Sequence, residues 1–215
     1  MPIPELNAEE IRVIGCLMEK AVVTPDQYPL TLNALTNACN QKSSRDPVMA
    51  LTQGEVQHTT RELESKNLLS VEENFKRGVE KYKQRLCNTG FSELQFSPAE
   101  YAIITLLLLR GAQTPGEIKS RSGRLHEFAD HQAVVDTLND LIEHEGGALV
   151  VKLPRQPGRK DCEYMHLFGG EIDMEEYASR TPSARSSEPG LRELVMDLQQ
   201  RVERLEQELS ELRAE

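Results

Sequence analysis

The chain has 215 residues, of which 38% are hydrophobic and 28% charged, so it can form a hydrophobic core and does not have the composition of a disordered protein. Its net charge of −10 argues against strong non-specific binding to nucleic acids. The first residues carry neither a basic region nor an apolar run, and the longest apolar stretch, around Ile103 to Leu109, is too short to span a bilayer. We therefore expect a cytoplasmic protein without a membrane partner.

Residues 1–90 are predicted to form a first small domain. Asn7 and Glu10 have the spacing of a capping box, as do Thr52 and Glu55, and each pair marks the start of a helix. The expected elements are a helix from Asn7 to about Val22, a helix after Pro29, a polar loop over 41–47, a third helix over 53–66, and a β-hairpin over 68–72 and 79–86 with a basic tip.

Residues 91–170 are predicted to repeat this order as a second domain. Ser97 and Glu100 form another capping box, Thr114 begins a short helix, and Asp130 begins a third helix that ends before Gly146. A second hairpin is expected over 148–153 and 162–168. The two Thr-Pro turns, at Thr24 and Thr114, lie 90 residues apart, which indicates an internal duplication. Three helices closed by a hairpin are typical of the winged helix, so the predicted fold class is mainly α with small β-hairpins (α+β), in two tandem winged-helix domains.

The last 45 residues have a different pattern. Residues 171–190 are polar and are interpreted as a linker. Beyond them, apolar residues alternate at spacings of four and three, which predicts a coiled-coil helix over 191–215. This pattern favours a homodimer in which the two helices run parallel. A single amphipathic helix that packs on its own chain is the alternative. The predicted seam consists of Leu191, Val195, Leu198, Val202, Leu205, Leu209 and Leu212.

Several motifs resemble the YceH family of uncharacterised bacterial proteins. The strongest is the run from Thr24 to Asn33, continued through 38–43, and the runs 110–117 and 153–160 match as well. The similarity covers about residues 5 to 170. It implies the same tandem winged-helix architecture that the predicted elements indicate, and it implies no activity.

Enzymatic and metal-binding motifs are not found in the sequence. There is no phosphate-binding GxxxxGK[ST], dinucleotide-binding GxGxxG, HExxH or GxSxG pattern. The five histidines are scattered, and the four cysteines form no CxxC pair, which predicts free thiols and neither disulfides nor a zinc site. We therefore expect no catalytic residues, no metal and no cofactor.

Positive charge is the remaining functional signal. Arg61 and Gln57 lie on the predicted third helix, where they could contact base edges, and basic residues of the loops and hairpin tips could contact phosphates. The predicted nucleic-acid contacts are Lys42, Arg45, Gln57, Arg61, Lys76, Arg77, Arg155, Arg159 and Lys160.

Two hypotheses about function follow from this distribution of charge. The first is a non-enzymatic, dimeric regulator that binds double-stranded DNA. The second is an acidic tandem winged-helix adaptor that binds a partner protein instead of DNA. The second hypothesis is favoured by the predicted third helix of the second domain, which carries Asp130, Asp136, Asp140 and Glu143 and would repel phosphates.

Overall fold

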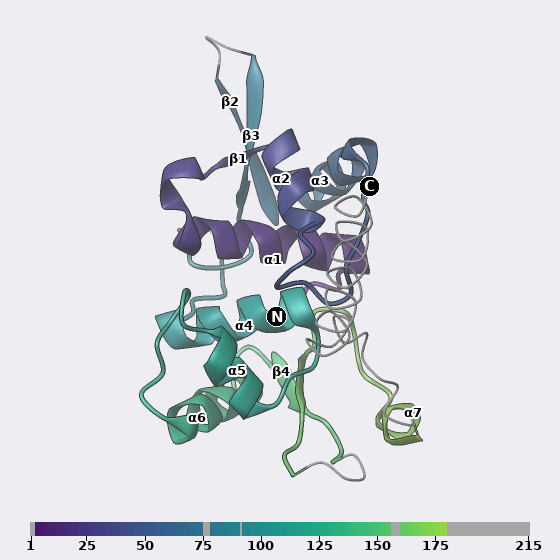
Figure 1. The fold of residues 1–215 in the computed structure, drawn as a ribbon. Helices are drawn as coiled ribbons and strands as arrows, with labels where there is room; N and C mark the ends of the chain where they lie inside the picture. The colour runs from purple at the N-terminus through teal and green to yellow at the C-terminus, as the bar shows by residue number, and fades with distance from the viewer. Residues whose placement is uncertain (1–2, 75–77, 91, 156–159, 180–215) are drawn as a thin grey trace, which may run out of the picture. The chain divides into compact units, whose positions relative to one another are not determined.

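The computed structural model describes residues 3–74, 78–90, 92–155 and 160–179, and shows an α+β protein with small antiparallel sheets (Figure 1). Residues up to Ser179 belong to one compact unit. The "first half" and "second half" below are residues 1–90 and 91–170. The predicted coiled coil, 191–215, with its seam Leu191, Val195, Leu198, Val202, Leu205, Leu209 and Leu212, lies outside the described residues.

In the first half, three helices pack beside a three-stranded sheet. Strand β3 is its central strand and pairs antiparallel with β1 on one side and β2 on the other, with Leu30 opposite Tyr82 and Val71 also opposite Tyr82. The strands β2 and β3 extend away from α1 in Figure 1. The elements are α1 (Ala8–Val23), the short 3-10 helix η1 (Pro25–Gln27), β1 (Leu30–Thr31), α2 (Leu32–Cys39), α3 (Gln53–Ser65), β2 (Leu69–Asn74) and β3 (Val79–Gln84).

The second half repeats this order with a smaller sheet. An isolated bridge between Gln113 and Tyr164 stands where the first half has β1. The elements are α4 (Pro98–Arg110), α5 (Pro115–Arg121), α6 (His131–Ile142), β4 (Val150–Lys152) and β5 (Tyr164–His166), and β4 pairs antiparallel with β5.

Local capping fixes where the helices begin. The side chains of Asn7, Thr52, Ser97 and Thr114 each accept a hydrogen bond from the backbone of the third helical residue, a glutamate that bonds back to the cap. Asp130 caps α6 with its side chain alone, which accepts a hydrogen bond from the backbone N–H of Ala133. All five predicted helix starts are confirmed, because these signals depend on residues only three positions apart.

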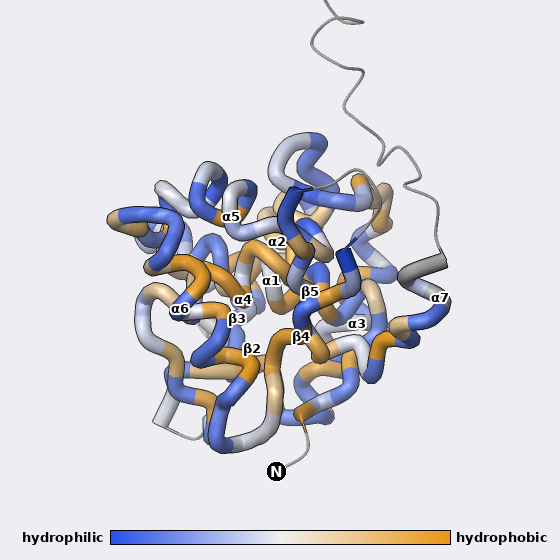
Figure 2. The backbone as a smooth tube through the Cα atoms, turned by 90° about the horizontal axis from the view of Figure 1, so that it is seen from below, coloured by the Kyte–Doolittle hydropathy of each residue, from blue (hydrophilic) through white to orange (hydrophobic). Residues whose placement is uncertain are grey.

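The contact between α1 and α4 joins the two halves. Nine consecutive residues of α4, from Tyr101 to Leu109, are buried, so this helix is covered on every side. Figure 1 shows α1 along one side of α4, and the second half supplies α5, α6 and β5 on the others. Figure 2 shows stretches of hydrophobic colour along α4, α6 and β4.

Gly15 determines how closely α1 approaches α4. A Cβ atom at this position would lie 2.9 Å from Leu109 Cδ2 and 3.1 Å from Leu108 Cβ. The Tyr101 hydroxyl donates a 2.9 Å hydrogen bond to the Met18 carbonyl across the same contact. The two helices therefore pack closely because α1 has no side chain at this point.

Part of the predicted linker is helical. The helix α7 (Met174–Ser179) lies within 171–190, and the Tyr177 hydroxyl donates a short hydrogen bond to the Glu163 carboxylate beside β5. Within the described part of the chain, no helix is both long and apolar enough to cross a membrane.

We expect Gly15→Val to lower the free energy of unfolding by about 1–3 kcal/mol, because the new methyl groups would force α1 and α4 apart. Gly54→Val is the matched control, since Gly54 is an exposed glycine of α3 whose added Cβ would meet nothing closer than Thr52 Oγ1 at 3.9 Å. Urea denaturation of both variants measures the effect. Equal stabilities would show that Gly15 does not set the helix spacing.

Candidate functional site

Arg45, one of the predicted phosphate contacts, is not a surface residue. It is 5% exposed, and its guanidinium forms a two-point pair with Glu19, at 2.6 Å (Nη2–Oε2) and 3.1 Å (Nη1–Oε1). Its Nε also donates to the Ala38 carbonyl at 3.0 Å. The prediction that Arg45 contacts phosphate is therefore wrong for this structure, because all of these interactions would have to break.

A second buried arginine serves the same helix end. Arg12 donates from Nη1 to the carbonyl of Cys39, the last residue of α2, at 3.1 Å, and from Nη2 to the Pro47 carbonyl at 2.6 Å. Cations beside the carboxyl end of a helix satisfy its free carbonyls and its partial negative charge. Arg12 and Arg45 thus hold α2 and the 41–47 loop against α1, and both charges are withdrawn from the surface.

Three other predicted contacts of the first half remain accessible. Lys42 is exposed in the loop, Arg61 is exposed on α3, and Gln57 is half-buried one turn before Arg61 on the same face of α3. The exposed His58 lies 3.4 Å from Glu62, so the same helix also presents carboxylate. Lys76 and Arg77, at the predicted hairpin tip, lie outside the described residues.

In the second half, Arg155 and Lys160 are exposed between β4 and β5, and Arg159 lies outside the described residues. The outer side of α6 is acidic, with Asp136 and Asp140 exposed one turn apart and Glu143 exposed just after the helix. Exposed carboxylates on α6 repel phosphates, which agrees with the charge pattern expected from the sequence.

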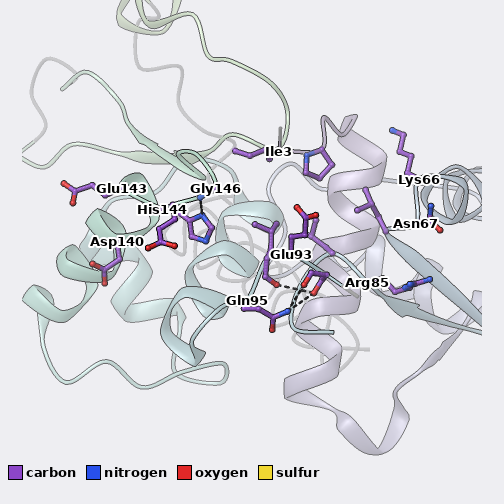
Figure 3. Close-up of a pocket in the computed structure, with 16 residues that line it drawn as sticks. Ile3, Lys66, Asn67, Arg85, Glu93, Gln95, Asp140, Glu143, His144 and Gly146 are labelled. Atoms are coloured by element: carbon purple, nitrogen blue, oxygen red, sulfur yellow. Dashed lines mark hydrogen bonds between the residues drawn. The ribbon is translucent and has the colours of Figure 1, made fainter. Parts of the chain in front are cut away.

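A groove of about 870 Å³ is lined by residues of both halves and is here called the acidic groove (Figure 3). One wall is the end of α6, with Asp140, Glu143 and His144. The opposite wall is the turn from α3 to β2, with Lys66 and Asn67, together with Arg85 after β3. Figure 3 shows Glu93 and Gln95 between the two walls. The apolar lining of the groove consists of Ile3, Pro4, Leu68, Leu86 and Leu94.

Negative charge dominates this groove. Four carboxylates line it, namely Asp140, Glu143, Glu145 and Glu93. One of its cations, Lys66, is paired with the buried Glu10 at 2.7 Å. The carboxyl end of α6 adds its own partial negative charge on the same wall, and the last turn of α6 carries no basic residue. The groove therefore favours a ligand that is both cationic and partly apolar.

Sequence reasoning did not find this groove. Its lining comes from the amino terminus, the α3–β2 turn, the 92–95 segment and the end of α6, which meet only after folding. The acidic character of α6 was visible in the sequence, but the apolar floor beside it was not.

All four cysteines are free, as the sequence predicts, and Cys16, Cys39 and Cys87 are buried.

Glu19→Gln should lower the free energy of unfolding at neutral pH by about 3 kcal/mol, because it leaves the buried Arg45 guanidinium without its carboxylate. Burial alone would raise the pKa of Glu19, but hydrogen bonds and charge from Arg45 hold that pKa below its ordinary value. A lowered carboxylate pKa stabilises the fold above the unfolded-state pKa, and this stability is lost as the pH falls through the folded-state pKa. The difference between the wild type and Glu19→Gln should therefore narrow in acid.

Urea denaturation at several pH values measures this difference. The control is Lys42→Ala, which removes an exposed cation from the 41–47 loop that also holds Arg45, and it should change the free energy of unfolding little. A pH-independent difference would contradict the role given to the Glu19 charge.

Comparison with known proteins places this architecture in a family. The family model described as "Protein of unknown function, DUF480" matches residues 6–159. The chain is 50% identical over 211 residues to a UPF0502 protein of Vibrio vulnificus, covering 98% of this chain and 96% of that protein. It is 49% identical over 210 residues to the UPF0502 protein YceH of Escherichia fergusonii, covering 97% and 93% respectively. The chain therefore belongs to the DUF480 family, which its motifs had already indicated through their likeness to YceH.

Proposed function

We propose that this chain is a tandem winged-helix protein, not an enzyme, and that it acts as an adaptor that binds a basic segment of a partner protein in the acidic groove. The observation that carries the proposal is the groove itself, where apolar residues of both halves lie among four carboxylates.

The order of elements supports the winged-helix part. Each half runs helix, short extended segment, helix, helix and hairpin, and in the first half the short strand β1 pairs with the hairpin strand β3. This is the order of a winged helix. The fold alone does not select the ligand, so the argument for function depends on the surface.

The size and charge of the groove support a peptide ligand. About 870 Å³ lies within the range of ligand-binding clefts and can hold several side chains. Apolar floor residues such as Leu68 and Leu94 can bury the aliphatic parts of a bound segment, while Glu143 and Glu145 face its lysines or arginines. We also propose that the chain and its partner protein meet in the cytoplasm.

Double-stranded DNA is the second candidate ligand. The observation that favours it is the face of α3, where Arg61 is exposed beside Gln57, as in a helix that reads a major groove. The burial of Arg45 and the carboxylates of α6 reduce the positive surface available for phosphates. The partner-protein reading is therefore the better supported of the two.

A labelled peptide of alternating lysine and leucine should bind the wild type, and Glu143→Lys with Glu145→Lys should weaken binding by about tenfold or more, because two attractive charges become repulsive. The matched control is Glu127→Lys with Asp161→Lys, which makes the same change in net charge at exposed residues outside the groove lining. Fluorescence anisotropy measures both affinities.

Equal losses in the two double variants would contradict the groove as the binding site. Mixed-sequence duplex DNA, titrated in parallel at about 50 mM salt, gives the second readout, since non-specific DNA affinity is greatest at low salt. DNA binding that falls with Arg61→Ala, or with Lys76→Ala and Arg77→Ala, while peptide binding is absent would favour the second candidate.

Dimerisation through residues 191–215 completes the proposal and rests on the heptad pattern of the sequence. Truncation after Ser187 should convert a dimer into a monomer, because it removes the whole predicted seam. Light scattering coupled to size-exclusion chromatography measures the mass. A truncated protein that stays dimeric, or a full-length protein that is monomeric, would refute this assignment.

A further inference from the structure

Positive charge gathers at the end of α5 and in the turn that follows it. Residues 119–126, here called the α5 basic segment, hold Lys119, Arg121 and Arg124 and no carboxylate. All three of these cations are exposed. A surface with one sign of charge attracts groups of the opposite sign, so this segment is a candidate surface for an acidic ligand.

Two of the three cations are available to such a ligand. Arg121 is already engaged, because it lies 3.3 Å from the Glu117 carboxylate and donates a 2.8 Å hydrogen bond to Gln113 Oε1. Lys119 donates a long hydrogen bond, of 3.5 Å, to the Ala129 carbonyl. Within the described ranges of the chain, neither Lys119 nor Arg124 forms an ion pair.

The α5 basic segment and the acidic groove lie at opposite ends of α6. The turn after α5 leads to Asp130, the cap at the amino end of α6, and Lys119 reaches the carbonyl of Ala129 beside that cap. Asp140 and Glu143, at the carboxyl end of α6, line the groove. The 12 residues of α6 make it about 18 Å long. Within one copy this helix keeps the two surfaces apart, so they can meet only between copies.

The α5 basic segment has the chemistry that the acidic groove favours. The groove presents four carboxylates around an apolar floor. The aliphatic chains of Lys119 and Arg124 can lie on such a floor while their charged ends face the carboxylates. The β2–β3 hairpin matches the groove less well, because Glu72 stands directly opposite Lys81.

We infer that the acidic groove of one copy binds the α5 basic segment of a second copy. The inference rests on the proposed function, because it names a partner for the same groove. The two surfaces in contact differ, so the interface is heterologous, and each assembly keeps one open groove and one open α5 basic segment at its ends. A basic segment of another protein would compete with this self-association.

Sedimentation equilibrium of the full-length protein measures the self-association. In about 50 mM salt, the weight-average mass should about double between about 10 μM and about 1 mM protein. The increase should disappear at about 0.5 M salt, because exposed charges are then screened. The mass at the lowest concentration is the reference, so dimerisation through residues 191–215 does not affect the comparison.

Two charge-reversal variants make the test specific. Lys119→Glu with Arg124→Glu gives the α5 basic segment the same sign as the groove, and Glu143→Lys with Glu145→Lys gives the groove the same sign as the segment. Neither double variant should self-associate alone. An equal mixture of the two should associate again, because each surface of one variant then meets the opposite charge on the other. This recovery also shows that both variants are folded.

The matched control is Lys83→Glu with Lys152→Glu, which makes the same change in net charge at exposed residues of β3 and β4 outside both surfaces. The control should associate like the wild type. A constant mass of the wild type, a loss of association in the control, or a mixture that does not associate would each overturn the inference. If the lysine–leucine peptide binds the groove while the mass stays constant, only self-association fails, whereas absence of peptide binding contradicts the proposed function itself.

Discussion

The close contact of α1 with α4 is the interaction on which the rest of this structure depends. Gly15 lets the backbone of α1 approach Leu108 and Leu109, and the buried Tyr101 adds a hydrogen bond across the contact. Because α4 is buried on all sides, it belongs as much to the core of the first half as to that of the second. The acidic groove is lined by residues of the two halves, so it exists only because this contact fixes one half against the other.

The fold separates the charges of the chain in a way that its composition does not indicate. The guanidinium groups of Arg12 and Arg45 lie inside the molecule at the carboxyl end of α2, and Lys66 is paired with the buried Glu10. The carboxylates of α6 stay at the surface. The pairs Arg45–Glu19 and Lys66–Glu10 each cancel in charge, so the argument for a cationic protein segment over a phosphate backbone depends on where the α6 carboxylates lie and not on the net charge.

The extent to which this molecule could be predicted depends on the range of the interactions involved. Helix starts were predictable because a capping box connects residues three apart, as between Thr52 and Glu55. The hairpins followed from alternating sequence patterns with turn residues between them. The family was recognisable from its motifs. The short strand β1 was missed because two residues carry no periodicity, and α7 was missed because its polar sequence resembles a linker.

Long-range pairing explains the remaining errors. Arg45 stands in a polar loop, where sequence reasoning expects an exposed cation, but its partner Glu19 lies 26 residues earlier on α1. Nothing in the loop itself indicates that pairing. Likewise, Arg12 sits in a helix whose apolar residues dominate the pattern, and its contact with the Pro47 carbonyl spans 35 residues. Contacts such as these, between residues far apart in the sequence, become apparent only in the folded chain.

The 41–47 loop also bears on how the molecule unfolds. The backbone N–H of Asp46 donates a 2.9 Å hydrogen bond to the carbonyl of Leu109, so a loop of the first half closes onto the last turn of α4. Loss of the second half would leave the Asp46 N–H without its acceptor and would expose the side of α1 that packs against α4. Because residues up to Ser179 form one compact unit with a shared core, we expect the two halves to unfold together, in contrast to tandem domains joined by a flexible hinge.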